Sequence, residues 1–233
     1  PGEHGVVGYR IDVDGEVINM LSWRTPQGDA RQRVVPEDFQ AVEPFCGQRP
    51  VVVQNAPFLK TGFTRAHLRG TRQHNWHTMA TISVEVRRAL SAGEPFVYAY
   101  YDGIDKTAHV HGFGDYYAAE LAACDRLVSD LMMDLPRGAA LVVTADHGIV
   151  DCTVGRTELD SSLFPMIRRQ SGEARFRWFH AEPGRSRELA AVAVETVGDD
   201  GWVASIEQVI DEQWFGPTVT DVALSRLGDV AVV

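Results

Sequence analysis

Two apolar runs that stop at acidic residues constrain the fold of this chain more than any other feature of its sequence. Residues 96–101 read FVYAYY and are followed by Asp102, and residues 141–145 read LVVTA and are followed by Asp146. Between them, residues 115–135 place apolar side chains at steps of three and four, which is typical of an amphipathic helix. A strand, a helix and a second strand at this spacing predict a βαβ unit with parallel, buried strands.

The remaining pattern also predicts a chain that mixes strands and helices. Residues 5–23 alternate apolar and polar side chains around Asp14-Gly15, a turn pair typical of a β-hairpin. Further strands are expected at residues 51–53 and 174–181, and helices at residues 79–90 and 185–198, the last with Ser186 as N-cap. We therefore expect a single α/β domain over residues 1–233, with a mostly parallel central sheet, helices on both faces and a smaller hairpin region.

Charge and cysteine usage limit the partners and the compartment. The chain carries 22 Lys and Arg against 32 Asp and Glu, a net charge of −10, so a nucleic-acid polymer is not expected as its main partner. Cys46, Cys124 and Cys152 are widely spaced and odd in number, which predicts unpaired thiols in a reducing, cytoplasmic compartment. No stretch approaches the ~18 apolar residues of a membrane helix, so no membrane association is expected.

Each of the two apolar runs delivers a carboxylate and an imidazole to its end. Asp105 and His109 are four residues apart, so one helical turn would bring them to one face. Asp146 and His147 are adjacent and need a bend in the chain, which Gly148 permits. Ligands bind at the carboxyl ends of parallel strands, and carboxylate oxygen and imidazole nitrogen suit Zn²⁺. These four residues are therefore candidate metal ligands.

Simpler interpretations exist for each motif taken alone. An Asp and a His four residues apart commonly form a solvated helix pair, and a lone DHG sequence arises by chance. Asp102 is an alternative to Asp105, although its seven-residue gap to His109 is less suited to a shared site. The presence of both pairs at consecutive strand ends of one βαβ unit favours the metal-site interpretation.

At these residues the chain resembles the type I phosphodiesterase/nucleotide pyrophosphatase family of the alkaline phosphatase superfamily. The resembling stretches are PGEHGVVG at residues 1–8, YYDGIDKTAHVHG at residues 100–112 and VVTADHGIVD at residues 142–151. They correspond to the family's HGIVGN-like segment, its DxxGHxxG motif and its strand ending in DHG, in the same order. The resemblance implies an alkaline-phosphatase-like α/β fold, of which this chain would be an incomplete core.

The resemblance also implies a site with two zinc ions. Asp105 and His109 would be ligands of the first ion, and Asp146 and His147 of the second. The family's nucleophile, a Thr or Ser, would lie upstream of Pro1, and a later ligand His beyond Val233. Two departures stand out: Ala108 occupies a position where the family has Gly, and His180, in the context WFHAEPG, is expected to have a structural or substrate-edge role.

The implied activity is metal-dependent hydrolysis of phosphodiester or nucleotide pyrophosphate bonds through a covalent phospho-Thr or phospho-Ser enzyme. The substrate would be a small-molecule nucleotide or phosphodiester, and the chain by itself would be inactive. Two alternatives remain open. The protein could be another hydrolase of the superfamily, such as a phosphonoacetate hydrolase or a phosphomonoesterase, or a non-catalytic binding module with a degenerate metal site.

Overall fold

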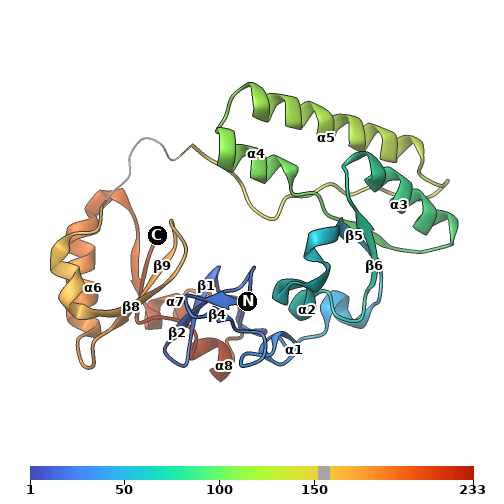
Figure 1. Cartoon of the computed structure of the whole chain (residues 1–233). Coiled ribbons are helices and arrows are strands. Elements are labelled where there is room, and N and C mark those ends of the chain that lie inside the picture. The colour runs from blue at the N-terminus through green and yellow to red at the C-terminus, as the bar shows by residue number, and fades with distance from the viewer. Residues whose placement is uncertain (152–157) are drawn as a thin grey trace. The chain divides into compact units, whose positions relative to one another are not determined.

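The computed structural model describes residues 1–151 and 158–233 and shows a mixed α/β protein, as predicted (Figure 1). Its described residues divide into two compact units. Unit 1 comprises Pro1–Val42, Thr61–His67 and the described part of Thr157–Val233, and unit 2 comprises Glu43–Lys60 and the described part of Leu68–Arg156. That residues 1–233 form one domain stays a prediction.

The N-terminal sheet of unit 1 contains the predicted hairpin. Its four strands pair in chain order and antiparallel: β1 (Arg10–Val13), β2 (Glu16–Asn19), β3 (Arg24–Thr25) and β4 (Gly28–Asp29). Val13 pairs with Glu16, so Asp14 and Gly15 form a two-residue turn, with φ of 50° and 89°. Two successive positive φ values are the geometry of a type I′ turn, which confirms the hairpin prediction.

A second antiparallel sheet in unit 1 is built from segments that are far apart in the sequence. Its strand order is β10-β11-β9-β8, with β8 (Ile167–Gly172), β9 (Arg177–Ala181), β10 (Val203–Ser205) and β11 (Val230–Val232). Helix α6 (Ser186–Val197) buries Leu189 and Ala193 in the apolar cluster beneath this sheet. The helix starts at Ser186, with Arg185 as its N-cap, so both lie one residue earlier than the predicted N-cap at Ser186 implied.

Short helices complete unit 1 around one large core. They are α1 (Pro36–Phe39), α2 (Gly62–His67), α7 (Ile206–Asp211) and α8 (Asp221–Leu224), with 3-10 turns at Ser161–Met166 and Gly198–Asp200. Trp23 and Trp178 are the largest fully buried side chains of this core. A β-carbon on Gly62 would lie 2.3 Å from the Trp23 Cβ, so α2 starts in direct contact with the indole side chain.

Unit 2 holds a parallel sheet of three strands. The order is β6-β5-β7, with β5 (Val51–Asn55), β6 (Arg72–Trp76) and β7 (Val97–Ala99), and 3-10 turns lie at Pro44–Gly47 and Ala56–Lys60. Helix α3 (Ala80–Ser91) buries Ile82 and Ala89 against Val51 and Val53. Helices α4 (Gly103–His111) and α5 (Asp115–Met133) follow, and α5 packs along α3 and α4 (Figure 1).

The prediction of a buried strand at residues 141–145 is wrong. These residues belong to no strand or helix, and Val142 is 82% exposed. The proposed βαβ unit across α5 therefore does not form, and the parallel pairs are β5 with β6 and β5 with β7. The physical reason is that β-branched composition fits a pleated, half-buried surface but does not supply a neighbouring strand to bond.

The structure describes two of the three cysteines. Cys46 and Cys124 are free thiols, as expected, while Cys152 lies outside the described residues. Among the helices of residues 1–151 and 158–233, none combines the length and apolar character that crossing a bilayer requires.

Candidate functional site

Helix α4 carries the first pair of predicted ligands on one face. β7 leads through Tyr100 and Tyr101 to Asp102, the N-cap, so Asp105 falls in the first turn of the helix and His109 in the last. The His109 Nε2 atom lies 3.4 Å from the Asp105 Oδ1 atom, as expected for side chains four residues apart on a helix. The pair is therefore pre-arranged by the helix itself.

The second pair reaches the same place from a distant part of the sequence. The His147 Nε2 atom lies 4.0 Å from the Asp105 Oδ1 atom and 3.8 Å from the Asp146 Oδ1 atom. All four predicted ligands thus meet around Asp105 and His147, within unit 2. The structure brings them together although residues 141–145 form no strand.

The backbone near residue 147 fixes the orientation of the His147 ring. Its Nδ1 atom donates to the Gly148 carbonyl oxygen at 2.9 Å, and the His147 amide donates to Asp146 Oδ1 at 3.2 Å. Donation from Nδ1 places the ring's lone pair on Nε2, the atom that faces Asp105. The chain bends at Asp146 and His147, as expected, and Gly148 does not adopt a left-handed φ in this bend.

Burial divides the four side chains unequally. The Asp105 side chain is 43% exposed, but its Oδ1 atom is buried and accepts no hydrogen bond, whereas the side chains of His109, Asp146 and His147 are 74%, 68% and 59% exposed. A buried carboxylate oxygen without a donor is costly unless a cation or a donor reaches it. This atom is therefore the strongest local indication that a positive charge belongs at the site.

The spacing of the donor atoms bears on whether a metal ion fits. Two ligands of one tetrahedral Zn²⁺, each about 2.0–2.1 Å from the ion, are roughly 3.3 Å apart. The 3.4 Å between His109 and Asp105 matches that separation, and the contacts of His147 are slightly longer. In the part of the chain that the structure describes, no three His, Cys, Asp or Glu side chains form a group that could hold a metal ion. Carboxylate oxygen and imidazole nitrogen are suitable ligands for zinc. To bind one ion together, the exposed side chains of His109, Asp146 and His147 would have to move closer to Asp105.

Asp102, the alternative ligand, has another partner. Its side chain is buried and forms an ion pair with Lys106, one helical turn further along α4. The Lys106 ammonium also lies 5.4 Å from the centre of the Phe58 ring. Asp102 thus anchors the start of α4, and the structure leaves Asp105 as the carboxylate that faces the imidazoles.

Two tyrosines, Tyr98 and Tyr100, lie near the carboxylates of this site and were not identified from the sequence. Burial, followed by the charges of Asp146, Asp102 and Asp105, raises the pKa of Tyr100 to about 12. Burial and the Asp146 carboxylate also raise the pKa of Tyr98. The alternation of side chains along an extended segment places residues 98 and 100 on one face, a signal that the sequence contained. Both phenols stay protonated and can donate hydrogen bonds beside the acids.

His180 lies in unit 1, where it supports the second antiparallel sheet. Its Nε2 atom is 2.9 Å from the Ser171 hydroxyl oxygen and its Nδ1 atom is 3.9 Å from the Asp12 carboxylate, which forms an ion pair with Arg169. His180, Ser171 and Asp12 are all buried. Of the two roles expected from the sequence, structural or substrate-edge, this placement between β1, β8 and β9 favours the structural one.

The buried position of His180 predicts a pH-dependent stability of unit 1. Burial lowers the pKa of His180 below its usual 6.5, although the Asp12 charge acts in the opposite direction. The unfolded chain therefore binds a proton more readily than the folded chain, and stability is lost as the pH falls from 6.5 through the lowered value. Urea titrations between pH 7.5 and 5 should show this loss, and His180→Gln should remove part of it. An equal pH slope in both proteins would contradict the assignment.

A parallel α/β unit with two carboxylates and two imidazoles gathered beside its sheet is an arrangement suited to hydrolytic phosphoryl chemistry. The type I phosphodiesterase / nucleotide pyrophosphatase family model matches residues 1–200, and the chain belongs to this family, which is of hydrolase type. Among curated proteins, none matches the chain. The family is the one that the motifs at residues 100–112 and 142–151 indicated.

Proposed function

We propose that the protein hydrolyses phosphodiester or nucleotide pyrophosphate bonds of small molecules at the cluster of Asp105, His109, Asp146 and His147. The observation that carries the proposal is their convergence from two distant segments, with donor atoms 3.4–4.0 Å apart. Family membership supports the reaction class, and the buried oxygen of Asp105 supports a bound cation.

In this proposal Asp105 and His109 hold one divalent metal ion, and Asp146 and His147 hold a second. Zinc fits the mixed carboxylate and imidazole donors, and when bound it stabilises negative charge on phosphoryl oxygens and lowers the pKa of water. The hydrogen bond from His147 Nδ1 to Gly148 keeps the ring oriented throughout turnover. Tyr98 and Tyr100 remain neutral because their pKa values are raised, so they add no negative charge opposite an anionic substrate.

The chemical step would use a Thr or Ser hydroxyl as nucleophile. Its oxygen loses its proton to solvent and forms a bond to phosphorus while the bond from phosphorus to the leaving oxygen breaks, and the leaving group departs with those electrons and takes up a proton from solvent. Water then attacks the phosphorylated enzyme and releases the second product. The family resemblance and not the present geometry suggests this covalent route.

The proposal is tested by comparing two substrates on the natural full-length protein. We expect bis(p-nitrophenyl) phosphate to be hydrolysed faster than p-nitrophenyl phosphate, because the family acts on diesters. Prolonged treatment with a chelator should abolish the activity, and Zn²⁺ should restore it.

Three outcomes would contradict the proposal. Preference for the monoester would indicate a phosphomonoesterase of the same superfamily. Full activity after chelation would exclude metal dependence. Absence of turnover on both esters and on nucleotide pyrophosphates, in protein loaded with zinc, would favour a binding module.

A further inference from the structure

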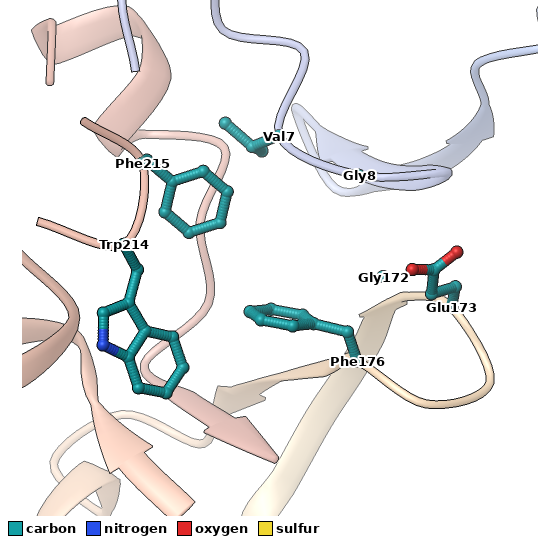
Figure 2. Close-up of a pocket in the computed structure, with 7 residues that line it drawn as sticks. All are labelled: Val7, Gly8, Gly172, Glu173, Phe176, Trp214 and Phe215. Carbon is teal, nitrogen blue, oxygen red and sulfur yellow. The ribbon is translucent and has the colours of Figure 1, made fainter. Parts of the chain in front are cut away.

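Unit 1 contains a hollow lined by aromatic rings that no part of the proposed function uses (Figure 2). Its volume is about 390 Å³, within the roughly 300–1,000 Å³ that is typical of small-molecule sites. Phe176, from the turn before β9, and Trp214 and Phe215, from the segment after α7, supply the rings. Val7, Gly8 and Glu173 line the other sides.

The rings stand at steep angles to one another. The Phe176 centroid is 6.2 Å from that of Trp214, at an interplanar angle of 73°, and 6.2 Å from that of Phe215, at 86°. A nucleobase held on both of its faces needs two parallel rings, and these rings provide no such slot. Walls at nearly right angles suit a rounded group better, and Figure 2 shows the three rings on one side of the hollow and Gly8 on another.

One carboxylate and three aromatic rings set the electrostatic character of the hollow. Glu173 is the one charged side chain among the described residues that line it, and aromatic faces add negative potential. Glu173 also lines a neighbouring hollow together with Arg10 and Arg177, where Arg177 donates to the Ala174 carbonyl at 3.3 Å and Arg10 lies over the Tyr9 ring. The faces of the rings, together with the Glu173 carboxylate, are the features of this hollow that favour a cation.

Hydrogen bonds hold the walls in place before any ligand binds. The Trp214 indole nitrogen donates to the Glu212 carboxylate at 2.7 Å, and its backbone amide donates to Val209 at 3.1 Å. The Gly2 amide donates to the Phe215 carbonyl at 3.0 Å, and the Glu173 amide donates to the Phe176 carbonyl at 2.7 Å. Trp214 nevertheless remains 37% exposed, so a ligand can reach its ring from solvent.

We propose that this hollow binds a quaternary ammonium group, with Phe176, Trp214 and Phe215 as the cage and Glu173 as the counter-charge. A primary ammonium carries three N–H donors, and one carboxylate among three rings would leave donors unpaired. A trimethylammonium group carries no N–H donor, presents apolar methyl groups and spreads its charge, which suits aromatic faces within about 6 Å. The site is separate from the four candidate metal ligands and does not depend on the phosphodiesterase proposal.

The test compares choline with its uncharged carbon analogue on the wild-type protein. In 3,3-dimethylbutan-1-ol a carbon atom replaces the nitrogen, so shape and apolar area are nearly conserved while the charge is lost. Isothermal titration calorimetry should show choline binding with a dissociation constant on the order of 1 mM or lower, and the analogue binding about tenfold or more weakly. Equal affinity for the two molecules, or no binding of choline, would overturn the proposal.

Substitutions of Trp214 separate ring chemistry from burial of apolar area. Trp214→Phe should retain choline binding within about threefold, whereas Trp214→Leu, which is apolar but has no π-system, should weaken it about tenfold. Glu173→Gln should weaken the binding of choline but leave the binding of the carbon analogue unchanged. Trp202→Ala, at a 73% exposed position of unit 1 outside the hollow, is the matched control and should not change binding.

Each variant is checked by its circular dichroism spectrum and melting temperature before titration. If Trp214→Leu binds choline as well as Trp214→Phe does, the rings do not act as a cation cage and the proposal is overturned. If Trp214→Leu fails to fold, the comparison of choline with its analogue on the wild-type protein still decides the question.

Discussion

Asp105→Asn should lower kcat/KM of the full-length protein for a phosphodiester by roughly 10³-fold or more. The Asp105 Oδ1 atom lies 3.4 Å from His109 and 4.0 Å from His147, so it is the point at which the two predicted ligand pairs meet. The amide is nearly isosteric with the carboxylate but neutral, and it is a poor ligand for a divalent cation. Steady-state kinetics on bis(p-nitrophenyl) phosphate, with saturating Zn²⁺, measure the effect.

Asp125→Asn is the matched control for this substitution. Asp125 is an exposed residue of α5, so the same chemical change there should leave kcat/KM within about twofold. Activity of the Asp105 variant close to that of the control would contradict the assignment of Asp105. A fall in activity accompanied by a lower melting temperature would point to a structural effect of the Asp105 substitution. His109→Gln then distinguishes loss of a ligand from loss of stability, because the His109 side chain is 74% exposed and its substitution should leave the fold intact.

Trp23→Ala should destabilise unit 1 by about 3–5 kcal/mol, a large part of the stability of a typical domain. Trp23 is fully buried, and its ring packs edge-on against Phe39 at 5.6 Å. The indole nitrogen donates to the Val34 carbonyl at 2.7 Å, so the substitution removes a hydrogen bond as well as leaving a cavity. Urea denaturation followed by circular dichroism measures the change.

Trp202→Ala is the control for that experiment, because it makes the same Trp-to-Ala change at an exposed position. Trp202 is 73% exposed, so truncating it should change stability by less than about 0.5 kcal/mol. A similar loss in both variants would mean that the core of unit 1 is not organised around Trp23. A loss below about 1 kcal/mol in Trp23→Ala would contradict the packing described here.

Local patterns in the sequence predicted those helices and hairpins that are determined by neighbouring residues in the chain. The Asp14-Gly15 hairpin needs only a turn that tolerates positive φ, and it forms as expected. Helix α5 spans Asp115–Met133, close to the predicted range, although Leu121 in the expected buried stripe is 42% exposed. Helix periodicity identifies the less polar face of a helix, but the number of neighbours decides how deeply that face is buried.

Long-range pairing could not be predicted in the same way. The order β10-β11-β9-β8 joins segments from residue 167 to residue 232, and nothing in the local sequence fixes that order. Residues 141–145 have the composition of a strand but pair with none in the described structure. The spacing of Asp105 and His109 was sufficient to place them together, whereas the approach of His147 depends on the tertiary fold.

The count of tightly bound zinc ions in the purified full-length protein tests the central claim most directly. Elemental analysis after dialysis against zinc and then against metal-free buffer should find about two ions per wild-type chain. Asp105→Asn and His147→Gln should each lose zinc, and Asp125→Asn should keep it. A wild-type protein without stoichiometric zinc, or variants that retain the full complement, would contradict a metal centre at Asp105, His109, Asp146 and His147.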